Sequence, residues 1–106
     1  MKFKTRKINC IEEVNGERLT RFKEKYGIDS FLYKGSKVEY KNAKPVVIKF
    51  WYVVEYQTGI AITGDTTKEA ALKRFEEWLT QDKRNIKRLQ DLINDKIKDW
   101  GVINND

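Results

Sequence analysis

The 106-residue sequence contains no histidine, one cysteine, one proline and six glycines. Without histidine the chain lacks the commonest general base and the commonest zinc ligand, which excludes Ser-His-Asp and Cys-His catalytic sites. A lone cysteine, Cys10, cannot form an intrachain disulfide, and we expect it to be a small buried hydrophobic residue. Few prolines and glycines leave little room for linkers, so residues 1–106 are predicted to form one domain.

Long apolar runs are missing as well. The run from Phe50 to Val54 is far too short to cross a bilayer. Basic residues at 1–7 are not followed by the apolar stretch of a signal peptide, so we expect a cytoplasmic protein without a membrane partner. The same segment has the charge of a flexible arm that lies along phosphates, although charged termini more often serve solubility.

Positive charge is concentrated in the first half of the chain. Residues 1–49 contain 13 Lys or Arg and 6 Asp or Glu, whereas residues 50–106 contain 9 and 10. Toward the end of the basic half, aromatic residues alternate with lysines, and lysines beside ring faces suit a polyanion that offers stackable bases. The residues predicted to bind nucleic acid or another partner are Lys34, Lys37, Tyr40, Lys41, Lys44, Lys49 and Trp51.

The N-terminal third allows two interpretations. Residues 2–14 alternate imperfectly between apolar and polar and are predicted to form one strand. Asn15-Gly16 is a strong hairpin-turn signal, which would make the next residues a second strand. A helix over 17–26 that ends at Gly27 fits the apolar spacing somewhat better, and both interpretations stay open.

From Phe31 the pattern has the period of a strand. A short hairpin is predicted around a turn at 34–36, followed by a loop at 42–45. Residues 46–56 are the most β-prone segment of the chain. One alternating set there has no charge, so we expect Phe50 to face the core and Trp51 to point outward. The uncharged set is Ile48, Phe50, Tyr52, Val54 and Tyr56.

Two helices are predicted to follow. Thr66 and Glu69 have the spacing of a capping box, which starts the first helix, and the chain is expected to bend near Gln81-Asp82. Gly101 ends the second helix. The predicted bounds are about 66–80 and 83–100 for the helices and 102–106 for a loose tail. The expected fold is a small α+β domain, in which the capped helix packs on an antiparallel sheet of roughly three to five strands.

The segment Thr66-Thr67-Lys68-Glu69-Ala70 begins a helix after a run of strands. In this order residues 46–79 resemble part of three families. These are the three-stranded DNA-binding N-terminal domains of some tyrosine recombinases, double-stranded-RNA-binding domains, and HicB-like antitoxins. The resemblance covers about a third of the chain, and of the lysine-rich helix start of the RNA-binding family only Lys68 is present.

One enzyme hypothesis comes from three charged residues. Asp29 with Glu39 and Lys41 is similar to the PD-(D/E)xK nuclease pattern, in which two carboxylates hold Mg²⁺ and a lysine assists the attacking water. Asp29 lacks a preceding proline, and short E-x-K matches arise by chance in a chain this rich in Lys and Glu. We therefore expect no enzyme, no metal and no cofactor, with a metal-dependent nuclease as the third hypothesis.

The leading hypothesis is a small non-enzymatic nucleic-acid-binding protein that uses a basic, aromatic-bearing sheet face for DNA or RNA. The alternative is a phage or mobile-element protein that inhibits a host factor or defence complex, as an anti-CRISPR protein does. Lysines that only solvate the sheet and protect its edge strands are a simpler explanation of the same charges.

Overall fold

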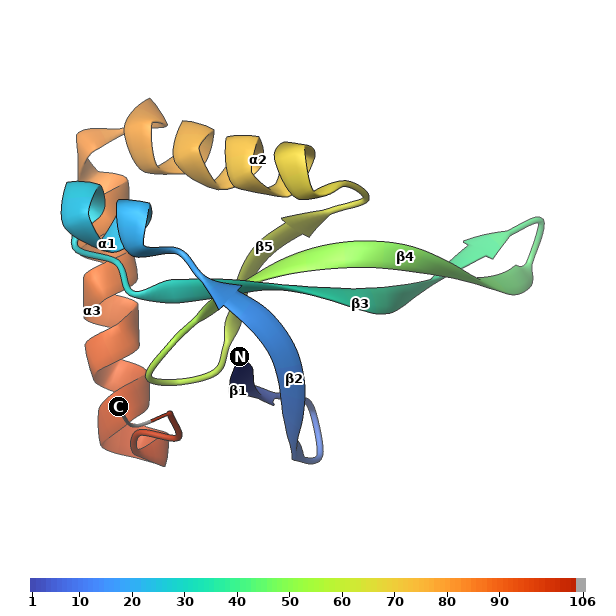
Figure 1. Ribbon diagram of the computed structural model, residues 1–106, viewed down its shortest axis with the longest axis horizontal. Helices are drawn as coiled ribbons and strands as arrows, with labels where there is room; N and C mark the ends of the chain where they lie inside the picture. Colours follow the sequence, from blue (N-terminus) through green and yellow to red (C-terminus); the bar gives the residue numbers. More distant parts are fainter. Residues whose placement is uncertain (105–106) are drawn as a thin grey trace.

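Each strand of the sheet pairs antiparallel with the next strand in the sequence, so the strand order is β1-β2-β3-β4-β5 (Figure 1). The computed structural model describes residues 1–104. In this part of the chain the strands are β1 (Lys2–Arg6), β2 (Ile11–Arg18), β3 (Ser30–Lys41), β4 (Lys44–Glu55) and β5 (Ala61–Asp65). The helices are α1 (Thr20–Tyr26), α2 (Lys68–Gln81) and α3 (Lys83–Trp100). The predicted α+β domain with an antiparallel sheet is confirmed.

The first hairpin turns at residues 7–10, earlier than predicted. The single strand expected over 2–14 is two strands, and the segment 1–7, for which a flexible arm was considered, provides β1. Asn15-Gly16 is not a turn, because it lies inside β2. A Cβ at Gly16 would come within 2.8 Å of the Leu32 carbonyl oxygen, so the glycine allows a close approach of two strands.

Residues 17–26 contain both structures that the sequence left open, because β2 ends there and α1 follows. Phe22 anchors α1 in the core with 1% of its surface exposed. The helix ends at Gly27, whose φ of 73° is left-handed. Cys10 is exposed, and the prediction that it is buried is wrong, because it lies in the β1–β2 turn rather than in a covered strand.

β3 and β4 form one long hairpin without the predicted turn at 34–36. Gly35 lies inside β3, where a Cβ would come within 3.0 Å of the Tyr33 ring and 3.2 Å of the Tyr52 ring. The loop expected at 42–45 is a two-residue turn, Asn42-Ala43. Both turn residues have a positive φ, 51° and 62°, as a type I′ turn requires.

Both sides of the inner sheet are covered. On one side the helices pack against Leu32 and Val53 in the larger core. On the other side the β1–β2 hairpin folds over the sheet and stacks Phe3 on Phe31, with ring centroids 4.5 Å apart. The buried residues of the larger core are Leu19, Phe22, Ile28, Leu32, Val53, Ala71, Phe75, Leu79 and Leu89. Those of the smaller core are Phe3, Phe31, Tyr33, Val54 and Tyr56.

The prediction that Trp51 points away from the core is wrong. Its ring packs, partly buried, against the larger core on the helix side of the sheet. The prediction assumed a sheet with one covered face. Val54 and Tyr56, which belong to the same alternating set as Phe50, do lie in the smaller core. Phe50 itself is only partly buried.

The N-cap of α2 is Thr67, whose hydroxyl accepts a hydrogen bond from the Ala70 N–H at 3.1 Å. The predicted capping box of Thr66 with Glu69 is therefore wrong: the N-cap lies one residue later, and Thr66 donates its N–H to the Asp65 carboxylate at 2.7 Å instead. The predicted bounds of α3 agree with the structure. No helix within residues 1–104 is long and apolar enough to span a membrane.

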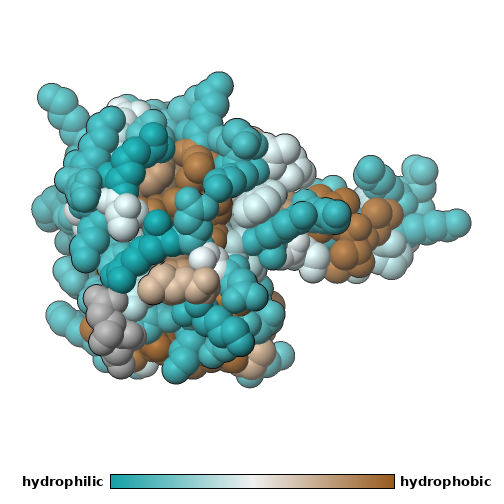
Figure 2. All heavy atoms as spheres, in the orientation of Figure 1, coloured by the Kyte–Doolittle hydropathy of each residue, from teal (hydrophilic) through white to brown (hydrophobic). Residues whose placement is uncertain are grey.

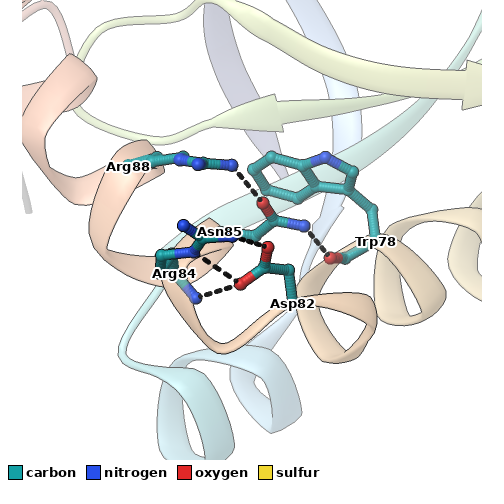
Figure 3. Close-up of polar contacts among 5 residues, drawn as sticks. All are labelled: Trp78, Asp82, Arg84, Asn85 and Arg88. Carbon is teal, nitrogen blue, oxygen red and sulfur yellow. Dashed lines mark hydrogen bonds and ion pairs between the residues drawn. The ribbon is translucent and has the colours of Figure 1, made fainter.

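Asp82 and Asn85 hold the corner between α2 and α3 (Figure 3). The Asp82 carboxylate accepts from the Arg84 N–H at 2.9 Å and pairs with its guanidinium at 3.0 Å, and these contacts hold the pKa of Asp82 below its usual value. Asn85 is buried and donates to the Trp78 carbonyl at 2.7 Å, one of the carbonyls that the end of α2 leaves unpaired. The corner fixes the direction of α3, which turns sharply away from α2 (Figure 1).

The end of the described chain runs beside β1. The Asn104 side chain accepts from the Lys4 N–H at 2.8 Å and donates to the Lys4 carbonyl at 2.7 Å, as a neighbouring strand would. The loose tail expected over 102–106 is thus held at its third residue, and residues 105–106 lie outside the described part of the chain.

Candidate nucleic-acid interface

The outer parts of β3 and β4 leave the sheet as a two-stranded ribbon, defined here as residues 34–50 (Figure 1). Within the described chain β2 pairs with β3 only at residues 31–33, and β5 pairs with β4 only at residues 51–54. The ribbon therefore has no neighbouring strand on either edge and no core beneath it. It contains six of the seven predicted binding residues, and Trp51 lies at its base.

The register between β3 and β4 divides the ribbon into two faces, because directly opposed residues point to the same side. The helix-side face, which continues from Trp51, consists of Lys34, Ser36, Val38 and Tyr40 with Pro45, Val47 and Lys49. The opposite face continues from Tyr33 and Tyr52 and is called the hairpin-side face. It consists of Gly35, Lys37, Glu39 and Lys41 with Lys44, Val46, Ile48 and Phe50. The predicted lysines are thus brought together on one ribbon but divided between its faces.

All five lysines of the ribbon are exposed, and none has a carboxylate within 4.0 Å among residues 1–104. Lys34 lies over the Trp51 ring at 5.9 Å, and Lys37 lies over the Phe50 ring at 5.0 Å. Lys41 and Lys44 are directly opposed beside the turn, and like charges in that position destabilise a hairpin. The ribbon therefore presents uncompensated positive charge to solvent.

The helix-side face also exposes apolar surface. Val38 and Val47 are directly opposed and are 54% and 70% exposed, and the neighbouring Tyr40 is 74% exposed. Figure 2 shows hydrophobic residues among hydrophilic ones along the projecting ribbon. An apolar pair beside an exposed ring, flanked by lysines, suits base edges, base faces or a protein surface.

The hairpin-side face begins at a series of aromatic rings. The ring centroids of Phe50 and Tyr52 are 5.0 Å apart, and those of Tyr52 and Tyr33 are 5.3 Å apart. Lys7 reaches this series from the β1–β2 turn, with its ammonium 2.8 Å from the Tyr33 hydroxyl. Lys7 was predicted only as part of a basic arm, and no local signal links it to a ring 26 residues away.

This contact affects two ionisable groups. Burial lowers the pKa of Lys7, but the hydrogen bond to Tyr33 and the attraction of nearby acidic groups outweigh that effect, so its pKa is raised above 10.5. Burial raises the pKa of Tyr52 above 10.0, and the neighbouring Tyr33 adds to the shift while Lys7 opposes it. Lys7 is therefore a cation at neutral pH, at the inner end of the ribbon.

The residues of the nuclease pattern do not come together. Asp29 is engaged by Arg18, with Nε 3.0 Å from Oδ1, and by Lys23 at 3.6 Å. Glu39 lies toward the ribbon tip, separated from Asp29 by extended chain that spans on the order of 30 Å. Residues 1–104 contain no group of three acidic, histidine or cysteine side chains that can hold a metal ion.

Comparison of the chain with protein-family models, with curated proteins and with solved structures found no match in any of the three.

Proposed function

We propose that this protein binds nucleic acid in the cytoplasm through the β3–β4 ribbon. The observation that supports the proposal is the set of five exposed lysines without carboxylate partners on one projecting element. Lysines neutralise phosphates and release the counterions that condense on nucleic acid, so such a set binds polyanions with little sequence preference. Among these lysines the opposed pair Lys41 and Lys44 should contribute most to the binding free energy, because a phosphate between the two ammonium groups removes their repulsion.

The shape of the ribbon suits this partner. The major groove of B-DNA admits a two-stranded β-ribbon, and a ribbon without neighbouring strands can enter it from the tip. Tyr40 then contacts bases, while Val38 and Val47 meet apolar base edges such as thymine methyl groups. Trp51 positions the base of the ribbon against the larger core rather than contacting nucleic acid directly.

The proposal is tested by mobility-shift titrations with a labelled duplex and a labelled single strand at two salt concentrations. Each phosphate contact contributes about −0.9 to the slope of log K against log salt on duplex DNA and about −0.7 on single strands. The double variant Lys41→Gln/Lys44→Gln should make that slope shallower by about two contacts. The matched control Lys83→Gln/Lys98→Gln removes the same charge from exposed positions on α3 and should leave the slope unchanged. Absence of binding at low salt contradicts the proposal.

A protein partner is the second candidate, and the exposed apolar pair Val38 and Val47 favours it. Under this candidate the ribbon tip inserts into a host protein, as expected of a phage or mobile-element inhibitor. The variant Val47→Lys separates the two candidates. It adds a cation and should strengthen salt-dependent nucleic-acid binding, whereas it should weaken an apolar protein contact.

A further inference from the structure

The outer edge of β5 is the second feature of the molecule that invites a partner. β5 is the last strand of the described sheet, so its outer edge has no paired strand. Two hollows of about 350 and 170 Å³ lie along this edge, and a third of about 670 Å³ lies beyond the start of β5, between Trp100 and the β1–β2 turn. Neighbouring hollows share residues. Ile62 and Trp78 line both the hollow of 350 Å³ and that of 170 Å³, and Ile60 lines both the hollow of 170 Å³ and that of 670 Å³. The hollows are therefore neighbours, and together they are called the groove, which begins beside β5 and ends at Trp100.

The wall opposite β5 comes from α2 and α3. The corner at Asp82 and Asn85 directs α3 along the groove, and the exposed Leu92 lies in its middle part. The side chains on this wall are Arg74, Phe75, Trp78, Leu89, Leu92, Ile93, Lys96 and Trp100. An unpaired strand edge beside an apolar wall is the arrangement in which an extended peptide adds a strand to a sheet.

One end of the groove is cationic. The Trp100 ring has the Arg6 guanidinium 4.8 Å and the Lys96 ammonium 4.7 Å from its centroid. Neither cation has a carboxylate within 4.0 Å among residues 1–104. Arg6 Nε donates to the Thr58 carbonyl at 3.3 Å, but its Nη2 is buried and makes no hydrogen bond within the described chain. A carboxylate that approaches the Trp100 end can therefore pair with these two uncompensated cations through charge-assisted hydrogen bonds.

We propose that this groove binds an extended segment of a partner protein that pairs with β5 and carries an acidic side chain at the Trp100 end. Alternate side chains of the segment enter the apolar groove beside Leu92, and the acidic one lies at the Trp100 end, near Lys96 and Arg6. We assign the carboxylate to a side chain rather than to a chain terminus, because the hollow at that end, about 670 Å³, has room for the chain to continue. The groove residues do not overlap the ribbon, so this interaction is independent of nucleic-acid binding.

The test starts from a displayed library of random 12-residue peptides selected against the whole protein. The selected peptides should alternate apolar and other residues and share an Asp or Glu toward one end. A synthetic copy is then measured by fluorescence anisotropy. Binding should weaken at least tenfold in Lys96→Glu and change less than twofold in the matched control Lys98→Glu, which has the same charge change at an exposed position two residues away.

Two further measurements identify the binding mode. A peptide with Lys in place of its acidic residue should bind Lys96→Glu more tightly than it binds the unaltered protein. Methylating the backbone nitrogens on one alternating set of peptide residues should abolish binding, and methylating the other set should not, because only one set faces β5. If a variant fails to fold in a thermal melt, Leu92→Lys replaces it, since Leu92 is 47% exposed.

Three results would each overturn the proposal. The first is no enrichment of peptides in the selection. The second is a selected peptide that binds Lys96→Glu and Leu92→Lys as well as it binds the unaltered protein. The third is equal binding of both methylated peptides.

Discussion

The inner and outer parts of the β3–β4 hairpin belong to the same two strands but have opposite surroundings. In the inner part Phe31 and Val53 are fully buried, one on each side of the sheet. In the outer part the directly opposed Val38 and Val47 remain more than half exposed, on a ribbon that no other segment of residues 1–104 covers. The comparison shows that a β-prone sequence does not by itself indicate a core, because burial depends on what is laid over each face.

Charge follows the same division. The described ribbon has five lysines and one glutamate. Glu55, at the inner end of β4, is buried, but its carboxylate accepts N–H bonds from Gln57 at 2.9 Å and Thr58 at 2.8 Å. Buried charge is therefore compensated within the fold, whereas the lysines of the ribbon have no carboxylate partner among the described residues.

The largest expected effect tests the comparison directly. Phe31→Ala should lower the free energy of unfolding by about 3–5 kcal/mol, because it empties a buried site stacked on Phe3. Val47→Ala in the exposed ribbon should change it by less than about 0.5 kcal/mol. Urea unfolding monitored by tryptophan fluorescence measures both. A similar loss in the two variants would show that the ribbon is covered in solution.

A smaller effect is expected at the boundary between the two parts. Trp51→Ala should lower the free energy of unfolding by roughly 2–3 kcal/mol, because the ring packs against the larger core. Phe50→Ala should cost roughly 1 kcal/mol, since its ring is partly buried and has Tyr52 as a neighbour. Urea unfolding followed by circular dichroism ranks them. The reverse order would restore the interpretation that Trp51 points outward.

The contact of Lys7 with Tyr33 should add roughly 1 kcal/mol of stability at neutral pH. The folded-state pKa of Lys7 is raised, so this stabilisation is complete below its ordinary value of 10.5 and is lost as the pH rises through the higher folded value. The pKa of Tyr52 is also raised, above 10.0, so the stability that it contributes is likewise lost as the pH rises. The free energies of unfolding of the unaltered protein and of Lys7→Met should therefore differ more at pH 8 than at pH 12. An equal difference at the two pH values contradicts this account.

The smallest effect concerns the ribbon turn. Ala43 has a φ of 62°, a left-handed conformation that costs a non-glycine residue about 1–2 kcal/mol. Ala43→Gly removes that cost but adds about 0.4–1 kcal/mol of chain entropy to the unfolded state, so a net gain of roughly 0.5 kcal/mol is expected. A thermal melt should show a slightly higher Tm, and the mobility-shift titration that tests the proposed function should give the same result as the unaltered protein. A lower Tm would mean that the turn adopts another conformation.

Several features of this protein could be predicted from local sequence. The bounds of α3 were predicted correctly because Asp82 caps one end and Gly101, with a φ of 75°, ends the other. The strand character of residues 46–56 was also predicted, since β-branched and aromatic residues dominate there. Six of the seven proposed binding residues lie together because one hairpin contains them. Each of these features depends on residues that are neighbours in the sequence.

Other features were decided only by the tertiary structure. Gly35 was predicted to lie in a turn, and Gly16 was a turn residue in one of two open interpretations. Each lies within a strand instead, where a backbone carbonyl or a ring from elsewhere in the fold occupies the space of a Cβ. Trp51 is partly buried because helices cover its side of the sheet, and the β1–β2 hairpin covers the other side. The groove that begins beside β5 combines a strand with two later helices and Arg6 from β1. Local patterns do not record such contacts, because burial and grooves arise only when distant segments pack together.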